Sequence, residues 1–172
     1  MKKIAKTFAK ILLTILIIIK FESCCFYSFT GASVPPHLKS ISISVADDRS
    51  GSAEPGLRES ITQKLIQKFI DDNSLQIVDR VNANSILETV IVSFNDAPAI
   101  VTAGENITSR RITIGIKASY RDLVKKSVVF DKVFTNYANY PSDGNLNDRN
   151  RAIEEIIEKT SEDILLETVS GW

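Results

Sequence analysis

The chain has 172 residues, with 21 basic and 21 acidic side chains, which is the length of one domain plus a short targeting segment. Residues 1–23 hold five lysines and one glutamate, so the remaining 16 basic and 20 acidic residues give a net charge of −4. This balance excludes a general attraction to the phosphates of DNA or RNA, and we expect no nucleic-acid partner. The only cysteines are the adjacent Cys24 and Cys25, which excludes a disulfide framework and a cysteine-based zinc site.

The N-terminus is typical of a secretory signal peptide. Lysines dominate the polar residues of Met1–Lys10, and Ile11–Ile19 is an apolar run interrupted only by Thr14. A membrane-spanning helix needs about 20 apolar residues, so this run is short for one. We therefore predict a signal peptide over residues 1–23.

The end of this segment predicts a lipid anchor. Ser23 directly before Cys24 resembles a bacterial lipobox, so Cys24 is the expected lipidation site, with Cys25 as the alternative acceptor. Two or three acyl chains on one cysteine would anchor the chain firmly. Phe21 and Glu22 are poor lipobox residues, so a secreted protein without lipid and an uncleaved membrane anchor remain alternatives.

After the cysteines, residues 24–39 are expected to form a lipidated N-terminal tether, and residues 40–172 a periplasmic α+β domain. Within that domain, alternation of polar and apolar residues predicts strands, and helical spacing of apolar residues predicts helices. The expected elements are a strand over Ser40–Ala46, a turn over Asp47–Gly56, a helix over Leu57–Ile70, strands over Leu75–Val78 and Ile86–Phe94, a loop over Asp96–Asn106, strands over Arg110–Asp122 and Ser127–Tyr137, a loop over Pro141–Asn150 and a helix over Arg149–Val169.

The strand over Arg110–Asp122 has the clearest pattern in the chain. Its isoleucines at 112, 114 and 116 share one face, and basic and hydroxyl side chains share the other. Such alternation is typical of an antiparallel sheet with one wet face. The order β-α-β-β-β-β-α then predicts an α+β fold, with a mostly antiparallel four- to five-stranded sheet and two amphipathic helices packed on one face.

Reactive groups are scarce in this sequence. The single histidine, His37, lies in the tether without a carboxylate nearby in sequence and is expected to be solvated. The pairs Asp47-Asp48 and Asp71-Asp72 lack the spacing of a calcium loop and are expected to lie in turns or at helix ends. We therefore predict no catalytic residue, no metal and no cofactor, and a protein that is not an enzyme.

Two charged sets are candidate binding surfaces. Arg111, Lys117 and Arg121 share the wet face of one strand, and Lys132 lies on its probable neighbour, so these four could contact the phosphates of a lipid headgroup. Solvated charges at the sheet surface are the alternative. The last helix carries acids that are expected to be solvated, or alternatively to bind a basic partner: Glu154, Glu155, Glu158, Glu162, Asp163 and Glu167.

Several segments resemble the lipopolysaccharide-assembly lipoprotein (LptE) family, in its Bacteroidetes-type branch. They lie in order along the mature chain: Tyr27–His37, Glu105-Asn106 with Arg111–Ile114, Phe134–Tyr140, and Val169–Trp172. The resemblance implies a sheet with two helices on one side. It also implies a lipoprotein plug inside the LptD β-barrel of the outer membrane, facing the periplasm, that takes part in lipopolysaccharide transport and binds lipopolysaccharide through basic residues.

The resemblance does not assign those basic residues one by one, so the set Arg111, Lys117, Arg121 and Lys132 rests on strand parity alone. A second hypothesis is a stand-alone periplasmic lipoprotein that binds a small lipid or peptide between sheet and helices. Co-purification with a β-barrel protein would separate the two hypotheses.

Overall fold

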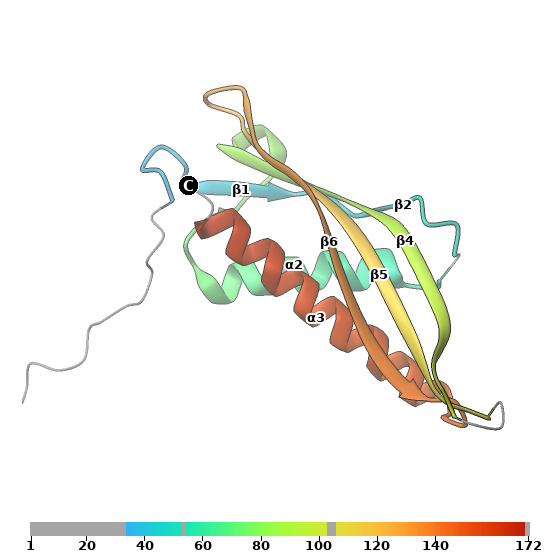
Figure 1. Ribbon diagram of the computed structural model, residues 1–172. Helices are drawn as coiled ribbons and strands as arrows, with labels where there is room; N and C mark the ends of the chain where they lie inside the picture. Colours follow the sequence, from blue (N-terminus) through green and yellow to red (C-terminus); the bar gives the residue numbers. More distant parts are fainter. Residues whose placement is uncertain (1–33, 53, 103–105, 171–172) are drawn as a thin grey trace, which may run out of the picture. The chain divides into compact units, whose positions relative to one another are not determined.

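The computed structural model describes residues 34–52, 54–102 and 106–170 of the chain (Figure 1). Their elements in chain order are β1 (Ser40–Ile43), β2 (Asp47–Asp48), α2 (Leu57–Asp72), β3 (Gln76–Ile77), the short 3-10 helix η2 (Arg80–Asn82), β4 (Ser85–Thr102), β5 (Asn106–Asp122), β6 (Ser127–Pro141) and α3 (Leu146–Ser170). None of the helices in these ranges is both long and apolar enough to cross a membrane.

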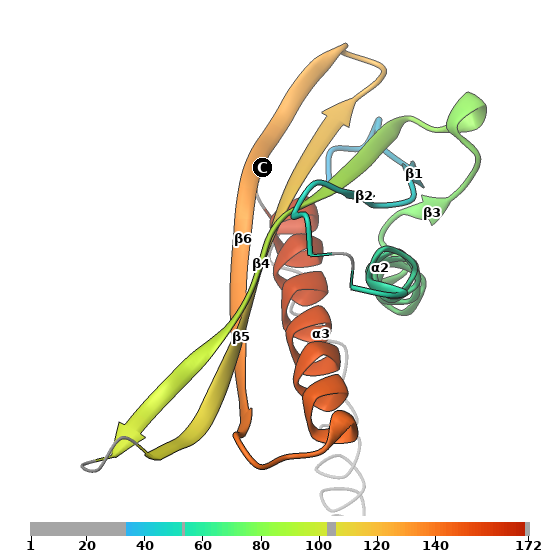
Figure 2. The same ribbon diagram turned by 90° about the vertical axis from the view of Figure 1, so that its right-hand side faces the viewer.

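The strands form one mixed sheet in the order β3-β1-β4-β5-β6, with β2 paired to β4. The three long strands β4, β5 and β6 are antiparallel neighbours, and the short strands β1, β2 and β3 add parallel pairs. Both helices lie on the same side of the sheet (Figure 2). The predicted α+β class is thus confirmed, with the two-residue strand β2 as an addition to the predicted order.

Strand β5 follows its sequence pattern. Ile112, Ile114 and Ile116 are fully buried under the helices, as are Ala118 and Tyr120 further along. The Tyr120 ring lies 5.7 Å from that of Phe130 on β6, and its hydroxyl donates a 3.0 Å hydrogen bond to the Ser85 Oγ on β4. A buried tyrosine needs such a partner, and this bond ties the beginning of β4 to β5 inside the core.

Helix α2 begins and ends where its sequence predicts. Gly56 precedes it with a φ of 73°, a left-handed conformation that glycine adopts without strain. Asn73 ends it with a φ of 56°, and its backbone N–H donates to the Phe69 carbonyl. Leu65 and Phe69 are fully buried between α2 and the rest of the core.

The predicted loop over Asp96–Asn106 is wrong for the residues of this range that the structure describes. Residues 96–102 belong to β4 and Asn106 begins β5, and the two strands pair along this stretch, with Asp96 opposite Ile112 and Pro98 opposite Arg110. Register shifts on both sides of Ile100 show where β-bulges absorb the irregular sequence. Pro98 is tolerated there because the described pairing of β4 with β1 and β2 ends at Ile91, which leaves this stretch of β4 as an edge.

Candidate functional site

The sheet surface opposite the helices, which we call the open face, is polar along β5 and carries the exposed Val133 and Tyr137 on β6. On β5 it carries Arg111, Thr113, Lys117, Ser119 and Arg121, which alternate with the buried isoleucines. The register places Asn139 opposite Arg111 and Val133 opposite Lys117. Three of the four basic residues predicted from the sequence therefore share one rigid surface.

Each of these three cations has its own partners. The Arg111 Nε donates a 2.9 Å hydrogen bond to the Asn139 Oδ1, and its guanidinium lies 4.2 Å from the Tyr137 ring centroid. The Lys117 ammonium is 3.1 Å from the Asp131 carboxylate, and an Arg121 Nη is 2.9 Å from that of Glu88. Arg111 thus has neutral partners among the described residues, and its charge is the best placed of the three for an anionic ligand.

Lys132 does not belong to this surface. A bulge leaves Val129 unpaired, because Tyr120 pairs with Phe130 while Arg121 pairs with Val128. One extra residue reverses the parity of a strand, so Lys132 lies opposite Ala118 on the helix side. Its ammonium there bonds the Glu167 carboxylate on α3.

Cys24, the alternative acceptor Cys25 and the predicted signal peptide over residues 1–23 lie outside the described residues, as does most of the predicted tether. The described end of the tether is packed rather than solvated. Leu38 is buried, and the His37 Nε2 lies 2.6 Å from the Oδ2 of Asp122, a carboxylate that is 1% exposed. The prediction of a solvated His37 is therefore wrong, because its partner comes 85 residues later.

Asp122 is the centre of this contact. Its Oδ1 accepts hydrogen bonds of 2.8 Å from the backbone N–H groups of Val124 and Lys125 in the β5–β6 turn. Burial disfavours the charged carboxylate, but the His37 hydrogen bond and the two N–H donors outweigh it, so the pKa of Asp122 is lowered. The contact joins the N-terminal end of the described chain to this turn.

A second polar cluster, which the sequence analysis missed, lies at the start of α3. Arg149 makes a two-pronged ion pair with Glu54 at 2.9 and 2.7 Å and reaches Asp96 on β4 at 3.4 Å. Asp96 also binds Arg110 at 2.8 Å and accepts a 2.8 Å hydrogen bond from the Tyr140 hydroxyl. We call these five residues the Asp96 cluster.

The charges of the Asp96 cluster are matched. Burial alone would raise the pKa of Asp96. The hydrogen bonds from Tyr140 and Arg110 lower it by more than burial raises it, so the pKa of Asp96 lies below its ordinary value. The Glu54 hydrogen bond raises the pKa of Arg149. Each charged group of the cluster already pairs with an opposite charge within it, which is typical of a cluster that stabilises the fold rather than of a catalytic site. No local sequence signal marked it, since its members are far apart in the chain.

The acids of α3 are largely exposed, as predicted, but two of them also pair with lysines of α2. Glu158 binds Lys64 at 2.8 Å and Lys68 at 2.7 Å, and Glu162 also binds Lys68. The hydrogen bonds from Lys64 and then Lys68 lower the pKa of Glu158 to about 2. Part of the predicted acidic face therefore pairs with α2.

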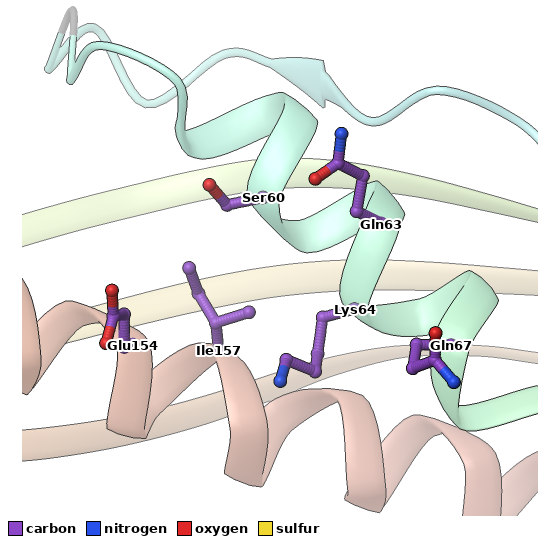
Figure 3. A pocket seen from close by; sticks show the side chains of 6 residues that line it. All are labelled: Ser60, Gln63, Lys64, Gln67, Glu154 and Ile157. Atoms are coloured by element: carbon purple, nitrogen blue, oxygen red, sulfur yellow. The ribbon is translucent and has the colours of Figure 1, made fainter. Parts of the chain in front are cut away.

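Beside these ion pairs, α2 and α3 enclose an open groove of about 390 Å³ (Figure 3). Its walls are Ser60, Gln63, Lys64 and Gln67 from α2 with Glu154 and Ile157 from α3. The groove is lined mainly by polar side chains and lies between the helices, whereas the sequence analysis expected a pocket between helices and sheet. Within the described ranges, no group of three or more metal-ligating side chains comes together.

Comparison with known proteins identifies a family whose model matches this sequence. The family model described as "LptE: Lipopolysaccharide-assembly" matches residues 38–168. None of the curated proteins matches the sequence significantly.

Solved structures share the fold at low sequence identity. Protein XCC0632 from Xanthomonas campestris is 12% identical with a TM-score of 0.60, over 80% of this chain and 90% of that one. An uncharacterized lipoprotein B from Nitrosomonas europaea is 9% identical with a TM-score of 0.55, over 80% and 84%. The rare lipoprotein B from Shewanella oneidensis is 15% identical with a TM-score of 0.51, over 73% and 92%.

The family match extends from Leu38, just after the His37 contact, to Thr168 near the end of α3. It therefore covers every described strand and nearly all of the last helix. The resemblance drawn from short sequence segments is confirmed, and the chain belongs to the LptE lipopolysaccharide-assembly family.

Proposed function

We propose that this protein is a lipopolysaccharide-assembly lipoprotein of the outer membrane, attached through Cys24 or Cys25 and facing the periplasm. Its partner in this proposal is an LptD-like β-barrel protein, which it serves as plug and assembly factor during lipopolysaccharide transport. The observation that carries the proposal is the family match over residues 38–168. Two of the structurally similar proteins are themselves named lipoproteins.

The geometry of the open face supports a role in binding rather than in catalysis. The open face is a rigid surface of three antiparallel strands, bare of helices, with Arg111 and Lys117 exposed on it. Arginine and lysine on such a surface suit the phosphate groups of lipopolysaccharide, because charge-assisted hydrogen bonds need fixed donors. We propose that the protein acts by binding and not as an enzyme.

The alternative function is a stand-alone lipoprotein that binds a small lipid or peptide. The groove between α2 and α3 favours it, since about 390 Å³ is within the range of ligand sites. Its polar walls suit a peptide better than an acyl chain.

The partner decides between these functions. When the tagged full-length chain is extracted from its native membranes in mild detergent, we expect a large β-barrel protein to co-purify in a constant ratio. The measurement is mass spectrometry of the complex after size exclusion. A clean monomer carrying a small ligand would contradict the barrel proposal and favour the alternative.

Lipopolysaccharide binding should depend on the open face. Changing Arg111→Gln and Lys117→Gln together is expected to weaken binding by roughly tenfold, since two charge-assisted contacts are lost. Stability should change by less than about 0.5 kcal/mol because both side chains are exposed. The matched control is Arg151→Gln with Lys159→Gln on α3, which removes the same charge elsewhere. Equal losses of binding in both double variants would contradict a role for this face.

A further inference from the structure

A separate pocket of about 370 Å³ lies at the end of the sheet where β5 turns into β6. It is lined by Arg80, Arg121, Asp122, Leu123, Lys126, Ser127 and Val128. Its walls come from η2 and from the β5–β6 turn, which Figures 1 and 2 both show at the same end of the sheet. Three of the lining side chains are cations.

Two of these cations are held close together by one carboxylate. Glu88 on β4 lies 2.9 Å from an Arg121 Nη and 3.4 Å from the Arg80 Nη1, so it bridges the two guanidinium groups. A single negative charge between two positive ones leaves the pair with net positive charge. Lys126 has no ion-pair partner among the described residues and adds to this excess.

The remaining acid of the pocket, Asp122, offsets one positive charge but makes no ion pair with Lys126. Both carboxylate oxygens of Asp122 are already bonded, Oδ2 to His37 and Oδ1 to the backbone of Val124 and Lys125. Asp122 therefore shapes the turn that presents Lys126 and is not available to pair with it. Counting Arg80, Arg121 and Lys126 against the carboxylates of Glu88 and Asp122, the pocket has a formal net charge of +1.

Two further details concern the side chains that line this pocket. Lys126 has a φ of 56°, a left-handed conformation that costs energy for a lysine and that glycine or asparagine adopts more easily. The Arg121 Nε is buried and has no hydrogen-bond partner among the described residues.

We propose that this pocket binds a phosphate group, either a monoester or a diester. Two guanidinium groups and one ammonium give the planar and point-charge donors that suit phosphate oxygens. Val128 lines the pocket at 60% exposure, and Val81 and Val124, next in sequence to lining residues, are 94% and 55% exposed. Apolar side chains beside a phosphate site suit the carbon skeleton of a lipid headgroup.

The inference deepens the proposed function, because lipopolysaccharide carries phosphate groups, and it adds a site that shares only Arg121 with the open-face candidates. It is tested on the full-length chain in mild detergent by isothermal titration calorimetry at constant ionic strength. The probes are inorganic phosphate and dihexanoyl phosphatidic acid. We expect saturable binding, weakened about tenfold or more in the double variant Arg80→Gln with Lys126→Gln.

The control is again Arg151→Gln with Lys159→Gln, which should leave the affinity unchanged. Lys126→Asn is the second test, because asparagine tolerates the left-handed turn. The melting temperature of this variant should be equal to or higher than that of the wild-type chain, while its affinity for the probes falls.

The two probes distinguish the sources of the phosphate group. Tighter binding of the lipid than of inorganic phosphate identifies a headgroup as the source, and equal binding identifies phosphate alone.

Unchanged affinity in the pocket variants, or no saturable binding of either probe, would overturn the phosphate site. Neither result touches the proposed barrel partnership, because co-purification is measured separately. Conversely, a chain that binds phosphate at this pocket but never co-purifies with a barrel would keep the site and remove the partner.

Discussion

Replacing Arg149 with alanine is expected to destabilise the domain by about 2–4 kcal/mol. Arg149 joins Glu54, before α2, to Asp96 on β4, and its side chain is 23% exposed. Its removal leaves two partly buried carboxylates with fewer partners, and the cost of an unpaired buried charge exceeds the value of an exposed ion pair. Urea unfolding followed by circular dichroism measures the difference in free energy.

The matched control for this prediction lies two residues further along the same helix. Arg151 is 80% exposed, and its nearest acid is Asp148 at 4.0 Å. Arg151→Ala should therefore cost less than about 0.5 kcal/mol, as exposed ion pairs contribute little. If the two alanine variants unfold at the same urea concentration, the Asp96 cluster does not stabilise the domain.

The second large effect is expected at Asp122, where alanine should cost about 2–3 kcal/mol. The substitution leaves the N–H groups of Val124 and Lys125 without their acceptor and removes the carboxylate that holds His37. Asp131→Ala is the control, since Asp131 is an exposed aspartate on the next strand, paired only at the surface with Lys117. Thermal unfolding of both variants measures the effect.

Acid should reduce the Asp122 contribution in a defined direction. The pKa of this carboxyl is lowered in the folded state, so its stabilisation is complete above its ordinary value of 3.8 and is lost as the pH falls through the lower folded value. The difference in stability between the wild-type chain and Asp122→Ala should therefore shrink below about pH 3.8. A difference that stays constant through this range would show that the carboxylate charge contributes nothing.

Local patterns in the sequence predicted most of the elements. The alternation in β5 gave both the buried isoleucines and the polar face with Arg111, because burial has the same period as the strand. The helical spacing after Pro55 and before Trp172 gave α2 and α3 for the same reason. These signals depend on residues close in sequence, and the structure confirms them.

Features that depend on distant residues or on register were not predictable. Lys132 was placed on the wrong face because the bulge at Val129 shifts β6 by one residue, and nothing in the sequence marks that bulge. The partner of His37 comes from a strand end 85 residues away. The Asp96 cluster and the pocket at the β5–β6 turn likewise combine side chains from elements that are far apart in the sequence and meet only in the fold.

The position of β1 between two other strands bears on the order of folding. This strand lies between β3 and β4, so residues 40–43 have no neighbour to pair with until residues 76–87 have been synthesised. The hairpins of β4, β5 and β6 close over short sequence distances and should form early, because nearby contacts cost less chain entropy. We therefore expect β1, the first strand in the chain, to be among the last parts of the domain to become ordered.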